Sequence, residues 1–333
     1  MQHRSYSFVI PVYNRPNEVF ELLESFQNLE GNFDYEIVII EDGSAEKSDA
    51  IIAKFPELNV SYFFKENSGP GDSRNYGMAH AKGNYFIILD SDVLLPPQYL
   101  KTVDDFLSQN FVHCFGGPDA AHPSFSNLQK AINFAMTSFL TTGGIRGGTQ
   151  QLEKFQPRSF NMGLSKEAFE TTKGFGKIHP GEDPDLTLRL WALGYKTALI
   201  ENAFVYHKRR ISWSKFKTQV HKFGMTRPIL NHWHPSSKKL IFWLPTCFIL
   251  GFFISILLLV FGFKWPLLVY AFYSLVVLLT AFFKTKSILI ALQSTIAVFI
   301  MFYGYGIGFL KSSLKLWLSN KTPEELFAKL FFK

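Results

Sequence analysis

Cysteine is nearly absent from this 333-residue chain, which has only Cys114 and Cys247. Two thiols cannot build a disulfide framework or a cysteine-rich zinc site, so those classes of protein are excluded. Acidic residues are missing from one long stretch, since none occurs between Glu201 and Glu324. No Gly-x-Gly-x-x-Gly motif follows the first predicted strand, and there is no Walker phosphate loop. Dinucleotide dehydrogenases and P-loop ATPases are therefore disfavoured.

Charge is distributed unevenly along the chain. Residues 1–100 carry 7 basic and 15 acidic side chains, whereas residues 201–333 carry 17 basic and 3 acidic ones. A basic C-terminal part indicates a polyanionic partner, either a membrane or a nucleic acid. The basic residues cluster beside long apolar runs, and lipid headgroups explain such a pattern better. We therefore expect an integral membrane protein and no nucleic-acid partner.

Three uncharged apolar runs follow one another, at residues 240–263, 265–283 and 287–310. Helices of roughly 20 residues, rising about 1.5 Å per residue, match a hydrocarbon core of about 30 Å. We expect two to three transmembrane helices over 240–310, with three as the first choice. A third span would put the basic tail outside, against the positive-inside rule. The alternative is a re-entrant or interfacial third segment, made flexible by the glycines of 304–308.

The composition divides the chain into four parts. They are an N-terminal domain at 1–206, a basic juxtamembrane segment at 207–239, the apolar region at 240–310 and a basic tail at 311–333. The juxtamembrane segment has nine Lys and Arg residues and no acid, which places the N-terminal domain on the cytoplasmic side. The first residues show no signal-peptide pattern. We expect a multi-pass protein of the inner, cytoplasmic membrane of the cell.

Strand and helix patterns alternate in the N-terminal domain. Strands are expected at residues 6–11, 35–40, 60–64 and 85–89, and helices at 16–29, 49–55, 71–82 and 97–109. This order predicts an α/β fold with a mostly parallel sheet flanked by helices. Ligands of such sheets bind beyond the carboxyl ends of the strands. Acids and an Asn occupy those ends in this sequence.

Asp90-Ser91-Asp92 follows the predicted strand at 85–89. In an extended chain, residues two apart face the same way, so both carboxylates can address one cation. Mg²⁺ or Mn²⁺ held by one or two carboxylates commonly takes its remaining ligands from phosphate and water. The motif therefore predicts a divalent metal site that serves a phosphate-bearing substrate.

Five ordered motifs resemble those of family 2 glycosyltransferases with the GT-A fold. They are Ser7–Arg15, Glu36–Ser44, Asn67–Gly77, Asp90–Asp92 and Gly181–Asp183. The resemblance covers about residues 5–210 and implies a GT-A catalytic domain, followed here by the transmembrane helical region. One departure is Glu41, where the family commonly has Asp. We therefore carry over the nucleotide role to Asp42 only.

The resemblance also implies roles for individual residues. Asp92 and Asp90 would hold Mg²⁺ or Mn²⁺, with His207 completing the coordination because imidazole suits Mn²⁺. Asp183 would be the general base, with Glu182 as its rival. The expected nucleotide-sugar-binding residues are Pro11, Tyr13, Asn14, Asp42, Arg74, Asp90 and Ser91.

These features predict an inverting, metal-dependent glycosyltransferase of cell-envelope glycan assembly. It would move one sugar from a nucleotide-sugar donor, possibly a UDP-sugar, to a lipid-linked or membrane-proximal glycan acceptor. The Gln-x-x-Arg-Trp motif of processive family members is absent around Arg227, which favours single-sugar transfer. Two alternatives stay open. One is a polyprenyl-phosphate glycosyltransferase, and the other is an inactive scaffold that binds a sugar nucleotide at the membrane.

Overall fold

The computed structural model describes residues 4–120, 122, 125–143, 155–207 and 212–332. The chain forms two compact units, which we call the sheet unit and the helical unit. The sheet unit comprises Met1–His122, Glu153–Lys208 and Phe331–Lys333, and the helical unit comprises Pro123–Leu152 and Arg209–Leu330. Neither unit is one continuous segment. Residues 123–152 belong to the helical unit, and the last three residues belong to the sheet unit.

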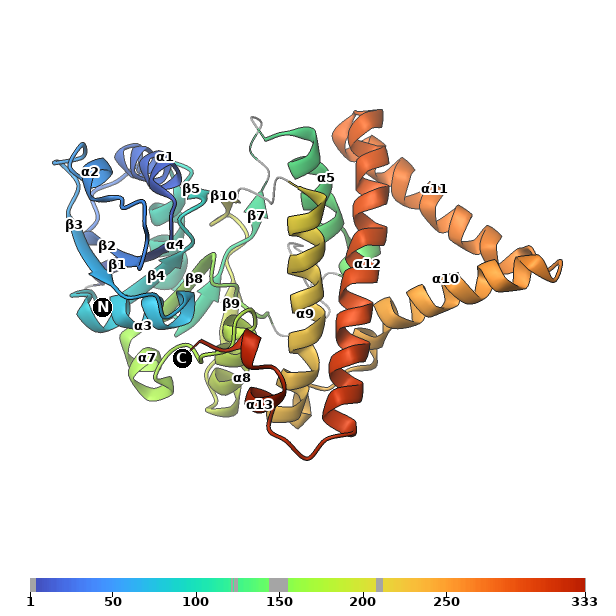
Figure 1. Cartoon of the computed structure of the whole chain (residues 1–333). Helices are drawn as coiled ribbons and strands as arrows, with labels where there is room; N and C mark the ends of the chain where they lie inside the picture. Colours follow the sequence, from blue (N-terminus) through green and yellow to red (C-terminus); the bar gives the residue numbers. More distant parts are fainter. Residues whose placement is uncertain (1–3, 121, 123–124, 144–154, 208–211, 333) are drawn as a thin grey trace. The chain divides into compact units, whose positions relative to one another are not determined.

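The sheet unit is built on a seven-stranded sheet in the order β3-β2-β1-β4-β8-β6-β9 (Figure 1). Its strands are β1 (Tyr6–Val12), β2 (Tyr35–Asp42), β3 (Val60–Lys65), β4 (Tyr85–Leu89), β6 (Cys114–Gly116), β8 (Asn161–Ser165) and β9 (Thr197–Leu199). Of these, β8 alone runs antiparallel to its neighbours. A second sheet has the order β5-β10-β7, formed by β5 (Val93–Leu94), β10 (Val205–His207) and β7 (Asp119–Ala120). The predicted mostly parallel α/β fold is confirmed.

Six helices flank the sheet: α1 (Pro16–Gln27), α2 (Asp49–Ile52), α3 (Pro70–His80), α4 (Tyr99–Gln109), α7 (Lys166–Thr172) and α8 (Glu182–Ala192). The predicted helix at 49–55 is only one turn long. Pro56 explains the early end, because a residue before proline is driven out of the helical region.

Side chains of β1 alternate between two hydrophobic cores, as a strand with both faces covered requires. Phe8 and Ile10 pack in a cluster with Phe26 of α1. Val9, between them, packs in the other cluster with Met78 of α3. The sheet is therefore buried on both faces, and its polar groups are left at the strand ends.

The helical unit consists of α5 (Asn127–Thr137), α6 (Phe139–Thr142), α9 (Trp213–Trp233), α10 (Leu244–Val260), α11 (Trp265–Thr285), α12 (Ile288–Trp317) and α13 (Pro323–Leu326), with 3₁₀ turns η1 (Pro235–Ser237), η2 (Leu240–Trp243) and η3 (Ala328–Leu330). In the predicted juxtamembrane segment, His207 is the last residue of β10, residues 208–211 lie outside the described residues, and most of the remainder forms α9 and η1. Within the described part of the chain, three helices are long and apolar enough to cross a membrane: Leu240–Val260, Trp265–Thr285 and Ile288–Trp317.

The glycines at 304–308 lie inside one continuous 30-residue helix, α12, so the expectation of a flexible stretch is wrong. Gly304 and Gly308 pack closely against α9, and Gly306 packs against the start of α10. A Cβ on Gly308 would lie 2.4 Å from the carbonyl oxygen of His221, and one on Gly224 would lie 2.1 Å from that of Tyr305. Small residues on both helices thus let the two backbones approach each other.

We predict that Gly224→Ala destabilises the protein although alanine is the better helix former. At an exposed helix position this change would gain about 1 kcal/mol. Here the new methyl group meets a backbone carbonyl, and overpacking of this kind costs typically 1–3 kcal/mol. Thermal unfolding of the purified protein in detergent measures the effect, with the exposed Ser214→Ala on the same helix as control. An unchanged or higher Tm for Gly224→Ala would contradict the close packing.

Candidate functional site

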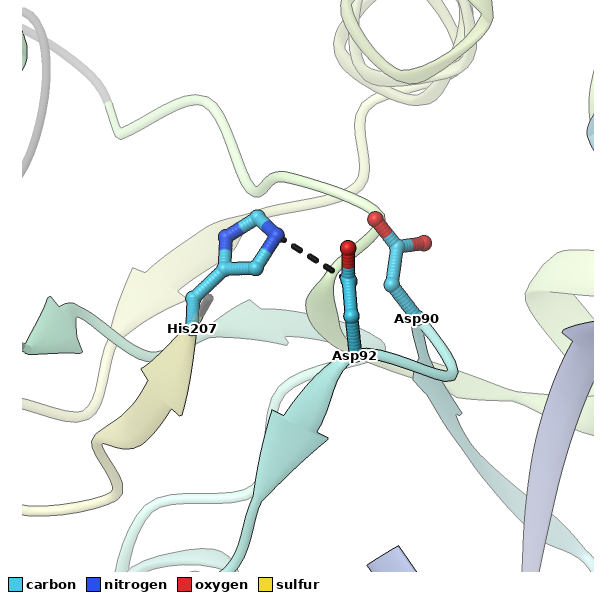
Figure 2. A group of neighbouring side chains, drawn as sticks. All are labelled: Asp90, Asp92 and His207. Atoms are coloured by element: carbon cyan, nitrogen blue, oxygen red, sulfur yellow. Dashed lines mark ion pairs between the residues drawn. The ribbon is translucent and has the colours of Figure 1, made fainter. Parts of the chain in front are cut away.

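Asp90, Asp92 and His207 form a group of metal-ligand type in the sheet unit. One ligand atom from each residue lies within 4.8 Å of the others, and Figure 2 shows the three side chains converging. Asp90 and Asp92 do not lie in an extended chain, as we expected from the sequence, but in a turn between β4 and β5. The turn still directs both carboxylates to one place.

The second sheet brings His207 to the two aspartates from a distant part of the sequence. β10 pairs antiparallel with β5, and His207 lies opposite Val93, the residue that follows Asp92. The ring of Phe160 stacks on the imidazole with ring centroids 4.8 Å apart. Strand pairing and stacking together fix the orientation of the imidazole.

Cationic neighbours keep Asp92 ionised. His207 Nε2 lies 3.3 Å from its carboxylate, and Arg15 donates a hydrogen bond to it. Burial would raise the pKa of Asp92, but the hydrogen bond and charge of His207 and those of Arg15 outweigh it and hold the pKa well below its usual value. On the other side of the ring, Asp119 Oδ2 lies 3.8 Å from His207 Nδ1. A second carboxylate beside a ligating imidazole is typical of metal sites.

The donor set fits a hard or borderline divalent cation. Carboxylate oxygens are preferred by Mg²⁺ and Mn²⁺, and imidazole is acceptable to Mn²⁺. Asp90 is the most exposed of the three, with 32% of its side chain accessible, while Asp92 and His207 are at 11% and 15%. The group is therefore open on the side of Asp90, where substrate oxygens could complete the coordination.

Arg74 connects this group to the Glu182-Asp183 motif. Its Nη2 donates to Asp90 at 2.7 Å and its Nη1 donates to Glu182 at 3.0 Å, with only 3% of the side chain exposed. The two carboxylates come from segments about a hundred residues apart and are held by one rigid guanidinium fork. The predicted metal motif and the predicted base motif are thus direct neighbours.

The carboxylate of Glu182 has three polar partners. Besides Arg74, it contacts His179 Nδ1 at 3.1 Å and accepts the backbone N–H of Gly181 at 2.9 Å. Burial would raise the pKa of Glu182, but His179 and Arg74 outweigh it and lower the pKa to about 2. A carboxylate with so low a pKa is a poor proton acceptor. Its surroundings suit Glu182 to positioning rather than to catalysis.

Asp183 lies in the first turn of α8 and is more accessible, with 16% of its side chain exposed against 5% for Glu182. The N-cap of α8 is Gly181, at φ 125°. The carboxylate of Asp183 lies 3.6 Å from Arg158 Nη1. The Asp183 carboxylate is therefore partly accessible to solvent and has Arg158 as a cationic neighbour.

Asn14 follows the end of β1 and contacts the loop after β2. Its backbone is left-handed, with a φ of 53°. Its side-chain oxygen accepts the backbone N–H groups of Ala45 and Glu46 at 2.8 and 3.1 Å. Asn tolerates this backbone conformation better than most residues. Asn14 thus shapes the loop after β2. Tyr13 beside it is 54% exposed and available to a ligand.

Asp42 holds the loop that leads into α3. Its carboxylate accepts the backbone N–H groups of Ser68 and Gly69, both at 2.9 Å, and pairs with Lys65 Nζ at 2.8 Å. Asn67 Nδ2 also donates to this carboxylate at 3.3 Å. Its roughly four lone-pair sites are therefore all engaged, and a base N–H would replace one of these bonds. Glu41, whose role the sequence left in doubt, is fully buried and accepts the backbone N–H of Ser48 at 2.9 Å.

Comparison with known proteins identifies the family. A family model described as glycosyl transferase family 2 matches residues 7–172, a range that contains the Asp90–Asp92 motif. The chain belongs to glycosyl transferase family 2.

Two curated relatives of this family 2 protein bear glycosyltransferase names. An uncharacterised glycosyltransferase of Rickettsia bellii is 37% identical over 106 residues, which are 31% of this chain and 15% of that protein. The chondroitin synthase of Escherichia coli is 26% identical over 236 residues, which are 61% of this chain and 34% of that protein. The chain thus spans about a third or less of the length of these relatives.

A solved structure shares the fold over almost the whole chain. The mannosyltransferase PcManGT from Pyrobaculum calidifontis, solved in complex with GDP-Man and Mn²⁺, superposes with a TM-score of 0.58 at 16% identity. The match covers 95% of this chain and 88% of that one. At this identity the likeness shows the fold alone, which is the expected GT-A arrangement.

Some neighbours of the family 2 site have no signal in the sequence. Arg158, Asp119 and His179 lie outside every motif that we recognised. Arg158 and Asp119 reach the site through tertiary structure, whereas His179 lies three residues before Glu182 in the chain. Arg158 reaches it from the bridge that it forms with Asn161 at the start of β8. The remaining predicted residues, Pro11 in β1 and the buried Ser91, lie at the expected strand ends.

We predict that Arg74→Met weakens both the fold and the candidate metal site of this family 2 protein. Loss of the guanidinium leaves Glu182 buried without its cationic partner, and breaking a buried pair costs about 3–5 kcal/mol. Tm should fall by several degrees or more, and the Kd for Mn²⁺ should rise because Asp90 is no longer oriented. Arg74→Lys should rescue only partly, since an ammonium group lacks the two-pronged geometry.

Lys101→Met, at an exposed position of α4, is the matched control for loss of one positive charge. Differential scanning fluorimetry and Mn²⁺ titration measure the two effects. Wild-type Tm and Mn²⁺ affinity in Arg74→Met would refute the bridging role.

Proposed function

We propose that this family 2 protein is an inverting, metal-dependent glycosyltransferase. It transfers a single sugar from a nucleotide-sugar donor to a lipid-linked or membrane-proximal acceptor. The observation that carries the proposal is the buried bridge from Asp90 through Arg74 to Glu182. It sets a group able to hold a divalent cation beside the motif that supplies a base, and sugar transfer from a diphosphate needs both.

Asp183 is the general base in this proposal. It takes the proton from the acceptor hydroxyl while the acceptor oxygen forms its bond to the anomeric carbon. The bond between that carbon and the diphosphate breaks, and the nucleoside diphosphate leaves with the electron pair. Attack from the face opposite the leaving group inverts the configuration. Glu182, with its depressed pKa and three partners, positions Asp183 through the first turn of α8.

Asp90, Asp92 and His207 would hold the cation, as Mn²⁺ or Mg²⁺. A divalent cation bound there supplies electrostatic stabilisation of the charge that grows on the leaving diphosphate. Arg15 keeps Asp92 ionised and oriented. The donor nucleotide lies over the strand ends, with Tyr13, Asn14 and Asp42 at the base and Asp90 and Ser91 near the ribose and diphosphate.

The setting is the cytoplasmic face of the inner membrane, in the assembly of a cell-envelope glycan. Apolar helices long enough to cross a bilayer support the membrane location. Basic residues before them support the orientation. Similarity to the chondroitin synthase of Escherichia coli supports a polysaccharide context. Confinement to the membrane surface raises the effective concentration of a lipid-linked acceptor.

One observation favours a second acceptor class, a polyprenyl phosphate. Arg158 Nη1 lies 3.6 Å from Asp183, and a guanidinium is suited to bind a phosphate. Such an acceptor is already ionised, so Asp183 would orient it rather than take a proton. Parallel assays with a hydroxyl acceptor and a polyprenyl phosphate separate the two classes.

We predict that Asp183→Asn lowers kcat for a hydroxyl acceptor by 10²–10⁴-fold, the usual contribution of a general base. Donor binding should be retained, because Asp183 does not hold the nucleotide. Glu182→Gln should instead lower Tm, with kcat falling less than in Asp183→Asn. Transfer is measured with a panel of nucleotide sugars, and donor binding by calorimetry. An active Asp183→Asn beside an inactive but stable Glu182→Gln would reverse the assignment.

We predict that Asp92→Asn abolishes turnover and raises the Kd for Mn²⁺ at least tenfold, because the site loses a charged ligand. Chelation with EDTA should reproduce the loss in the wild type, and added Mn²⁺ or Mg²⁺ should restore it. Asp105→Asn, which removes an exposed carboxylate from α4, is the control. Full turnover in the presence of EDTA would rule out the metal role.

A further inference from the structure

The C-terminal end of the chain belongs to the sheet unit. Phe331 forms an antiparallel bridge with Ile178, and the backbone N–H of Phe332 donates to the carbonyl of Lys177 at 3.1 Å. The Phe332 ring lies against Gly69, where a Cβ would be 2.3 Å from Phe332 Cδ2. These contacts hold the C-terminal end on the same side of a membrane as the sheet unit.

The number of membrane crossings follows from this return. The chain leaves the sheet unit after His207 and belongs to it again at Phe331. A path that begins and ends on one side of a bilayer crosses it an even number of times. Three spans, our first choice from the sequence, are incompatible with this contact, although three helices have the required length and apolarity.

The two ends of α12 indicate which helix stays out of the bilayer. Its C-terminal part contacts the start of α10, since Trp317 stacks on Trp243 and Thr246 donates to the Gly306 carbonyl at 3.0 Å. Its N-terminus at Ile288 follows directly on the end of α11. If α10 and α11 each cross once, the start of α10 and the end of α11 lie on one side. A helix that joins these two places does not cross.

The arrangement within the helical unit agrees with this. In Figure 1, α10 and α11 run from the two ends of α12 and meet at a tip away from it. That tip is the short turn before Trp265, which contains Lys264. Only 17% and 11% of the apolar windows of the first two candidate spans are buried by protein, against 39% for α12. The apolar surfaces of α10 and α11 are thus mostly exposed, while other helices cover more of α12.

The main cover of α12 is a helix that does not suit a hydrocarbon core. His221 Nδ1 of α9 lies 3.0 Å from the Gly304 carbonyl, and Lys217 Nζ lies 5.2 Å from the Tyr303 ring. Lys215, Lys217 and Lys222 of α9 are exposed. Charged side chains are costly at the centre of a bilayer. The middle of α12 lies beside this part of α9 and therefore outside the hydrocarbon core.

The distribution of basic residues supports the same topology. With α12 on the side of the sheet unit, 16 of the 17 basic residues after position 200 lie on that side, and Lys264 alone lies opposite. This satisfies the positive-inside rule, which a third span would violate through the basic tail.

We propose that α10 and α11, with η2, form a two-span hairpin and are the only membrane crossings, and that α12 lies on the same side as the sheet unit. The lipid bilayer is the partner of the exposed apolar surface of the hairpin. The C-terminal Phe331-Phe332 pair anchors the tail to the sheet unit on that side. This inference does not depend on the enzymatic activity, and its test needs no substrate.

Single cysteines in a Cys114→Ala/Cys247→Ser background of the full-length protein test the topology. A membrane-impermeant maleimide is added to right-side-out and inside-out vesicles, and labelling is normalised to that in detergent. Asn320→Cys should label in the same vesicles as Lys101→Cys, which reports the sheet unit, and Lys264→Cys in the opposite ones. Labelling of Asn320→Cys together with Lys264→Cys would overturn the proposal. Labelling of all three from one side would exclude a crossing hairpin.

A cysteine pair tests the C-terminal contact independently. Residues paired across an antiparallel bridge are close enough for a disulfide, so Ile178→Cys/Phe331→Cys should cross-link in membranes. The product is a faster band on a non-reducing gel that reverts with reductant. Lys101→Cys/Phe331→Cys is the control and should not cross-link. Failure of the first pair to cross-link would remove the contact on which the even number of crossings depends.

Discussion

A single buried guanidinium organises the site of this protein. Arg74 donates to Asp90 and to Glu182, and almost none of its side chain is exposed. An unpaired charge in such a place would be very unfavourable, so both carboxylates must be present and ionised. His179 and Arg74 together hold the pKa of Glu182 low despite its burial. The same bridge sets the distance between the metal group and the first turn of α8.

The segment that carries Arg74 also links the loop after β2 to the group of Asp90, Asp92 and His207. Asp42 of β2 fixes Ser68 and Gly69, which lead directly into α3, and Arg74 lies one turn further on. The contacts of Asp42 and those of Arg74 are thus connected through the first turns of α3.

Much of the fold was predictable because its signals are local. Apolar strands at 35–40 and 85–89, with acids at their ends, already indicate a parallel sheet with a ligand edge, and the structure confirms the mostly parallel arrangement. The helix expected at 49–55 ends at Ile52, because Pro56 disfavours helical backbone at the residue before it.

The α/β class, the Asp90–Asp92 motif, the Glu182-Asp183 motif and the apolar helices can be recognised from the amino-acid sequence, because each depends on neighbouring residues. Which of them meet depends on tertiary contacts. His207 reaches Asp92 through strand pairing, and Arg158 reaches Asp183 across a loop. The relation of α12 to α9 and of Phe332 to Gly69 is equally invisible in the sequence. Hydropathy measures only whether a helix tolerates lipid, whereas packing partners determine whether lipid surrounds it.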